Sequence, residues 1–244
     1  MSDQRQLAAR LAEVSSELLR AAADEEPTFE TVVRRAVEIV PGCDAASITL
    51  VGRRGRAATV ASTDPACEAL DEVQYALGQG PCLDAAFEHG TVIVPDVDSD
   101  ERWPKWSAAA REYGLGSALA VRLHTPHETL GALNLFSHTR GAFGDQEAVD
   151  VAAIFAVHAT EAMSKARLVS GLQAAMESRH LIGMAQGVLA VRYDISYEAA
   201  FDVLHRFSNE TNTKLRQVAA HVVENRDLPA PEHEPQPRTE LDRT

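Results

Sequence analysis

The feature that most constrains this chain is an uninterrupted helical pattern that begins near Asp145. Apolar residues recur there every three or four positions, with no glycine or proline before Gly171. This spacing places them on one stripe of a helix: Val149, Ala152, Ala156, Ala159, Met163 and Ala166. A second stripe follows on the same helix: Val151, Phe155, Ala162, Val169 and Leu172. The pattern predicts a long helix with one face on a sheet and the other against a second chain.

The N-terminal residues show a similar pattern. Leu7, Leu11, Val14 and Leu18 recur at helical spacing and predict a helix over residues 1–22. One domain is not expected to bury both this stripe and the stripe from Val149 to Met163. We therefore expect a homodimer held by the N-terminal and linker helices.

Between these helices the pattern predicts a mixed domain. Residues 28–40 fit another helix that stops before Pro41-Gly42. Five runs fit strands: 45–51, 56–62, 91–94, 117–123 and 129–136. Helical patches separate them at 65–76, 82–88 and 104–113. This order predicts an α+β fold built around an antiparallel sheet.

After the long helix, three short amphipathic segments follow, at 179–191, 197–207 and 214–225. Ser196 and Thr213 stand at the expected N-cap positions of the second and third. Their apolar positions predict a three-helix core: Ile182, Ala185, Leu189, Ala200, Val203, Leu204, Phe207, Leu215, Val218 and Val222. Residues 227–244 are rich in proline and charge and are expected to be disordered.

Charge narrows the class of partner. The net charge is −13, which excludes a protein that coats nucleic acid along its whole surface. Residues 1–165 carry 14 basic and 25 acidic side chains, whereas residues 166–226 carry seven basic and six acidic ones. Only this second region is electrostatically suited to nucleic acid.

Other features of the composition point to a reduced, cytoplasmic protein. Cys43, Cys67 and Cys82 are an odd number with wide spacing, so neither a disulfide framework nor a paired-cysteine zinc site is expected. The histidines are scattered and predict no metal site. No signal peptide or membrane span is expected, because no apolar stretch approaches 18 residues.

The segment from His180 to Glu224 closely resembles the ANTAR family. The resemblance rests on Ile182-Gly183 and Ala185-Gln186-Gly187, on Ser196, Glu198-Ala199 and Leu204, and on Leu215 and Val218-Ala219. Many family members have lysine at the position of Gln186. The resemblance implies binding to paired RNA hairpins in leader transcripts and antitermination of transcription.

Nine polar residues, eight in this segment and Arg179 directly before it, are the candidate RNA-binding residues: Arg179, Gln186, Arg192, Arg206, Asn209, Thr211, Asn212, Lys214 and Arg216. Arg206, Lys214 and Arg216 are expected to contact phosphates, whereas Asn209 and Asn212 are better placed to read bases in a loop. The alternative is that Thr211, Asn212 or Thr213 serves only as a helix cap.

Residues 27–165 resemble a GAF domain, of the subtype found ahead of ANTAR domains. The residues that carry the resemblance are Leu77-Gly78-Gln79-Gly80-Pro81-Cys82-Leu83-Asp84-Ala85, Arg102-Trp103-Pro104, Gly131-Ala132-Leu133-Asn134-Leu135 and Ala142-Phe143. GAF pockets house many small molecules, so the ligand class stays open. The signature of the cyclic-nucleotide subtype is absent. Cys82 stands at a helix start, where a thiol can be activated, but an inert buried thiol is commoner.

These observations predict a GAF domain over 27–165, with no cofactor, then a linker helix and an ANTAR domain over 166–226. The expected function is a non-enzymatic RNA-binding antitermination regulator. Two alternatives stay open. One is a GAF-type methionine sulfoxide reductase, and the other is a protein-interacting signalling module without RNA binding.

Overall fold

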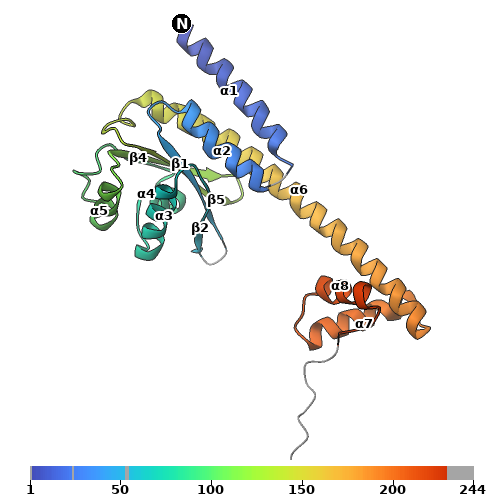
Figure 1. Cartoon of the computed structure of the whole chain (residues 1–244). Helices are drawn as coiled ribbons and strands as arrows, with labels where there is room; N and C mark the ends of the chain where they lie inside the picture. The colour runs from blue at the N-terminus through green and yellow to red at the C-terminus, as the bar shows by residue number, and fades with distance from the viewer. Residues whose placement is uncertain (1, 24, 53–54, 230–244) are drawn as a thin grey trace, which may run out of the picture. The chain divides into compact units, whose positions relative to one another are not determined.

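A computed structural model describes residues 2–23, 25–52 and 55–229 of the chain. They fall into two compact units, Met1–Ser170 and Gly171–Thr244 (Figure 1). Within the described residues, no helix combines the length and the apolar character that a membrane crossing requires.

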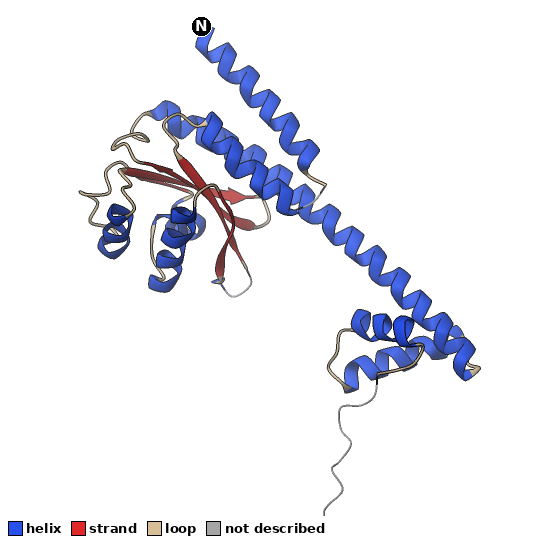
Figure 2. Ribbon diagram, viewed as in Figure 1, coloured by secondary structure: helices blue, strands red, loops and turns tan. Residues whose placement is uncertain are grey.

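The first unit is built on a five-stranded sheet in the order β2-β1-β5-β4-β3, with every neighbouring pair antiparallel. The strands are β1 (Ala45–Val51), β2 (Ala57–Ser62), β3 (Thr91–Val94), β4 (Ser117–His124) and β5 (Thr129–Ser137). All five predicted strands are confirmed, each to within one residue at either end. Figure 2 shows the sheet lying between two groups of helices.

Alternation along the strands sends side chains into two separate cores. On β4, Leu119, Val121 and Leu123 join the core under α1 (Ser2–Ala21), α2 (Glu25–Ile39) and the start of α6 (Gln146–Tyr193). The neighbouring Ala118 and Ala120 face the other core. That core lies under α3 (Pro65–Leu77), α4 (Pro81–Asp84), the π-helical turn η2 (Ala85–His89) and α5 (Pro104–Glu112). The predicted α+β fold is confirmed.

The two apolar stripes that predicted a dimer are buried inside one chain. Val14 and Leu18 of α1 pack with Ala152, Ala156 and the rest of the α6 stripe through Ala166 in a single core. Leu11 and Val149 are partly buried against it, and the side chain of Leu7 lies outside the described residues. The expectation that one domain leaves these stripes uncovered is wrong, because α1, α2 and α6 share one face of the sheet.

The second unit is a three-helix bundle of the C-terminal part of α6, α7 (Tyr197–Glu210) and α8 (Leu215–Asn225). Six of the ten predicted core residues are buried, and Ala219 joins them: Ala185, Leu189, Ala200, Leu204, Val218 and Val222. The other four are partly buried against this core: Ile182, Val203, Phe207 and Leu215. The predicted separation of segment 179–191 from the long helix is wrong, since α6 runs unbroken from Gln146 to Tyr193. Gly171 lies inside this helix, at a cost of about 1 kcal/mol relative to alanine.

Two details of the second unit correct the sequence analysis. Ser196 caps α7 as predicted, because its hydroxyl accepts a hydrogen bond from the Ala199 N–H at 3.1 Å. The predicted N-cap at Thr213 is wrong, because Lys214 occupies that position and its side chain makes no capping bond. The stretch 227–244 is described only to residue 229, and there Leu228 packs on the bundle core. Predicted disorder therefore starts too early at 227, and its extension over 230–244 lies outside the described residues.

Candidate nucleic-acid interface

The turn between α7 and α8 is fixed by hydrogen bonds of its own residues. Ser208 Oγ donates to the Thr213 carbonyl at 2.7 Å, and Thr211 Oγ1 donates to the Phe207 carbonyl at 2.8 Å. Asn212 has φ of 50°, in the left-handed region that asparagine tolerates better than most residues. These bonds hold the connection to α8 in one conformation.

Three of the predicted RNA-binding residues at this connection have different surroundings. The predicted end of the helix at 207 is too early, because α7 runs to Glu210 and includes Asn209, whereas Thr211 and Asn212 follow it. The hydroxyl proton of Thr211 is used inside the protein, which fits a structural role. Asn209 is exposed, and its amide lies 3.3 Å from the ring nitrogen Nδ1 of His205. Asn212 is exposed as well, and its side chain is presented to solvent by a fixed backbone. Asn212 is therefore the best placed of the three to contact a base.

The predicted cations lie on both sides of this turn. Arg206 is exposed near the end of α7, and Lys214 and Arg216 are exposed at the start of α8. Within the described part of the chain, none of these three side chains has a carboxylate within 4.0 Å. Unpaired, solvated cations of this kind are available to phosphate groups.

Arg216 also brings the start of α8 next to α6. It lines a small groove of about 200 Å³ together with the α6 residues Glu177, Ser178 and Leu181. Ser178 immediately precedes Arg179, which is exposed on α6. The structure thus places the Arg179 segment beside the start of α8.

The other two predicted residues are engaged elsewhere in the bundle. Gln186 Nε2 donates to the Tyr197 carbonyl at 3.1 Å, so this half-buried side chain ties α6 to the start of α7. Arg192 forms an ion pair with Asp227 beyond α8. Neither side chain is brought to the α7–α8 turn by these contacts.

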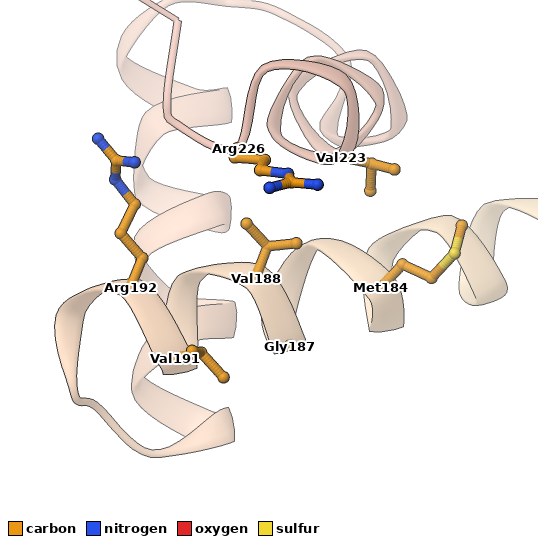
Figure 3. Close-up of a pocket in the computed structure, with 7 residues that line it drawn as sticks. All are labelled: Met184, Gly187, Val188, Val191, Arg192, Val223 and Arg226. Atoms are coloured by element: carbon orange, nitrogen blue, oxygen red, sulfur yellow. The ribbon is translucent and has the colours of Figure 1, made fainter.

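A larger groove of about 630 Å³ lies between the end of α6 and the end of α8. Figure 3 shows its lining residues: Met184, Gly187, Val188, Val191, Arg192, Val223 and Arg226. The lining is apolar apart from two arginines. Arg226 was not among the predicted residues. It is the C-cap of α8 and has φ of 57°. Its position at the end of a predicted helix is the one feature of the sequence that singles it out.

Sequence reasoning also missed three rings on α7. Tyr197 is 61% exposed and Phe201 is 39% exposed, and His205 follows at the same spacing of four. Their spacing of four residues is the sequence signal that places all three rings on one face of the helix. It was overlooked because aromatic residues at helical spacing usually belong to a core.

The first unit holds a buried polar cluster between the sheet and α3. Asp71 is fully buried and accepts hydrogen bonds from Ser47 Oγ at 2.7 Å, Thr59 Oγ1 at 2.9 Å and Asn134 Nδ2 at 3.1 Å. Burial raises the pKa of the Asp71 carboxyl to about 6, against the effect of these bonds. Asn134 Oδ1 is buried and has no partner among the described residues. The cluster therefore retains one unused acceptor.

The three thiols are buried and unpaired. Burial raises the pKa of Cys43, Cys67 and Cys82 to about 12 in each case. Cys82 Sγ donates to Thr49 Oγ1 at 3.1 Å, at the edge of the Asp71 cluster. These surroundings disfavour the thiolate, which is the reactive form.

One group of side chains resembles a metal-binding set that the sequence analysis did not anticipate. Ligand atoms of Asp84, Glu88 and His89 lie within 4.8 Å of one another along α4 and η2. Glu88 and His89 are exposed, and exposed acidic groups often occur together without an ion. The geometry alone assigns no metal to this group.

The architecture is an α+β domain followed by a small helical domain with an exposed polar turn. The profile of the GAF domain family matches residues 22–164, and that of the ANTAR domain matches residues 170–223. The chain belongs to the GAF domain family and carries an ANTAR domain after it. This pair of domains supports a signal-sensing, RNA-binding regulator.

Solved structures agree on the fold of the first unit. The GAF domain of an Acinetobacter phosphoenolpyruvate-protein phosphotransferase has 15% identity and a TM-score of 0.52, covering 68% of this chain and 98% of its own. The corresponding domain from Coxiella burnetii has 19% identity and a TM-score of 0.52, covering 68% and 96%. Free methionine-R-sulfoxide reductase from Neisseria meningitidis has 19% identity and a TM-score of 0.53, covering 66% and 90%. At such identities the likeness establishes the fold alone. No curated protein matches the chain.

Proposed function

We propose that this chain is a non-enzymatic antitermination regulator whose ANTAR domain binds RNA hairpins in leader transcripts. The observation that carries the proposal is the α7–α8 turn, where Arg206, Lys214 and Arg216 are exposed beside Asn209 and Asn212. The turn lies in the one region of the chain that is not strongly acidic. Cations for phosphates next to amides for base edges suit a hairpin loop.

The GAF domain is the proposed sensor, and the Asp71 cluster is the proposed site at which a small-molecule signal is recognised. A small molecule that donates a hydrogen bond would satisfy the free Asn134 Oδ1, and a buried acceptor without a partner costs about 1–3 kcal/mol.

A homodimer through the N-terminal and linker helices remains part of the proposal, but on residues other than those first expected. In the second unit, Leu172 and Met176 on α6 stand four residues apart and are 58% and 71% exposed. In the first unit, a groove of about 700 Å³ lies between α1 and α6 beside Leu11, Leu19 and His158. Pairing of two chains would remove this apolar surface from water at roughly 25 cal/mol per Å².

The enzymatic alternative is not favoured by the chemistry of the thiols. Thiol-dependent reduction of methionine sulfoxide needs a reactive thiolate, and burial raises the pKa of all three thiols to about 12. The protein-interaction alternative predicts no salt-sensitive RNA binding.

The proposal is tested by sequencing RNA that co-purifies with the full chain from its native cell, followed by binding of the recovered hairpins to pure protein. We expect enrichment of leader hairpins and an affinity that falls steeply with salt. Absence of hairpin enrichment together with salt-insensitive binding would reject RNA as the partner. Turnover of free methionine sulfoxide by the pure protein would reject the non-enzymatic assignment.

A further inference from the structure

The exposed face of α7 carries a ladder of rings. Tyr197, Phe201 and His205 recur every four residues, and Asn209 continues the series to the end of the helix. Side chains four residues apart are neighbours on a helix surface. With a rise of 1.5 Å per residue, the ladder from Tyr197 to Asn209 is roughly 18 Å long.

The ladder is held in place by contacts within the bundle. Phe201 and His205 stack with ring centroids 6.1 Å apart and planes inclined by 23°. The Asn209 amide lies 3.3 Å from His205 Nδ1. At the other end, the Tyr197 hydroxyl lies 3.6 Å from where a Cβ on Gly187 would stand, so its ring lies against α6. The rings are therefore ordered before any partner binds.

We propose that Tyr197, Phe201 and His205 form a stacking surface for the unpaired bases of an RNA loop. The inference rests on the proposed RNA-binding function and adds the residues that hold the base faces. Flat aromatic faces accept any base by stacking, which is how proteins commonly hold unpaired nucleotides. The ladder ends at Asn209, where the turn carrying Asn212 and Lys214 begins.

The charges around the ladder indicate where the bases and the phosphates of a bound RNA would lie. No lysine or arginine stands between Tyr197 and His205, whereas Glu198 and Asp202 do. These carboxylates repel phosphates, so an RNA on this face presents its uncharged bases to the helix. The phosphates are then left to Lys214 and Arg216 beyond the end of the ladder. A wholly apolar protein partner would instead bury both carboxylates against apolar surface, which is costly for unpaired charges.

The experiment uses the full chain and a pool of RNA hairpins with one common stem and a randomised loop. A selected member carries 2-aminopurine in the loop, and a continuous duplex of the same stem, which has no unpaired bases, serves as the control without a loop. Phe201→Leu and Tyr197→Leu remove a ring while keeping an apolar side chain that favours helix. Phe201→Tyr keeps the ring. Tyr113→Leu is the matched control, because Tyr113 is a similarly exposed ring in the GAF domain.

We expect each leucine variant to weaken loop binding roughly 5- to 100-fold and to lose 2-aminopurine quenching. The salt slope stays unchanged, since no phosphate contact is lost. Phe201→Tyr and Tyr113→Leu bind like wild type. Folded leucine variants with wild-type affinity and quenching would overturn the stacking surface while leaving RNA binding intact. A lower molecular mass in these variants with unchanged affinity would overturn it in favour of a chain–chain contact. If the wild-type protein binds no hairpin at all, the proposed function and this inference fail together.

Discussion

Asn134 on β5 donates a hydrogen bond to the buried carboxylate of Asp71 on α3 at 3.1 Å, joining residues 63 positions apart. The bond connects the sheet to the helix that covers it, at the centre of the GAF domain. Burial raises the pKa of Asp71 to about 6, so this carboxyl changes charge close to physiological pH.

The first prediction concerns stability against pH. The pKa of Asp71 is higher in the folded chain than in the unfolded one, so folding favours the protonated form. Its stabilising effect is full below pH 4 and is lost as pH rises through 6. The shift from 3.8 to about 6 corresponds to about 3 kcal/mol. Fluorescence of Trp103 and Trp106, both in this unit, reports the unfolding during denaturant titration of the full chain.

Asp71→Asn provides the control, since the amide cannot ionise. We expect the difference in unfolding free energy between this variant and wild type to change by a few kcal/mol between pH 4 and pH 7, in favour of the variant at pH 7. A pH-independent difference would show that Asp71 titrates at its ordinary pKa.

The second prediction concerns the thiols. Because burial raises the pKa of Cys82 to about 12, a thiol reagent should modify it in the folded protein far more slowly than in the unfolded chain. Replacing Cys43, Cys67 and Cys82 by alanine or serine should leave RNA affinity within about threefold, roughly 0.7 kcal/mol. A peroxide-dependent change in binding that vanishes in Cys82→Ala would contradict this account.

Much of the fold was predictable because its residues alternate clearly. On β4, large apolar residues at 119, 121 and 123 alternate with alanines at 118 and 120, and the two sets enter different cores. The burial of the α1 and α6 stripes inside one chain could not be predicted in this way. Periodicity identifies an apolar face but not the element that packs on it. The apolar stripe of α6 was expected to pack on a second chain, but α1 of the same chain packs in the same core.

The candidate site was predictable only in part. Charge and residue type predict the turn residues as an RNA surface, and that role stays a prediction. The contacts of Gln186 with Tyr197 and of Arg192 with Asp227 could not be predicted. Such contacts join segments separated in sequence and leave no local signal. Thr213 failed as a cap because helix α8 starts one residue later than its residue type indicated.

The third prediction addresses the dimer. Leu172→Glu should convert a wild-type dimer to monomer in light scattering at micromolar concentration, because it places a charge in the exposed apolar stripe of Leu172 and Met176. Val191→Glu is the matched control, since Val191 is 87% exposed on the same helix but lies outside this stripe. A wild-type monomer, or a dimer insensitive to Leu172→Glu, would exclude pairing through this part of the linker helix.

The fourth prediction separates base reading from capping in the turn. Asn212→Gly removes the side chain but keeps the left-handed backbone that φ of 50° requires. We expect it to preserve the melting temperature and to lose discrimination between cognate and altered loops by roughly 1–3 kcal/mol.

Thr211→Val serves as its counterpart, because it removes the hydrogen bond to the Phe207 carbonyl. It should lower the melting temperature without changing specificity. The opposite pattern, with Asn212→Gly affecting stability alone, would assign Asn212 a purely structural role.

The fifth prediction bears on the RNA surface itself, and the dependence of hairpin affinity on salt tests it most directly. Lys214→Ala and Arg216→Ala should weaken binding to all hairpins about equally and reduce the slope of log affinity against log salt by roughly one each. Lys105→Ala, an exposed lysine of the GAF domain, is the control and should leave the slope unchanged. Wild-type affinity and an unchanged slope in both α8 variants would contradict the proposed interface.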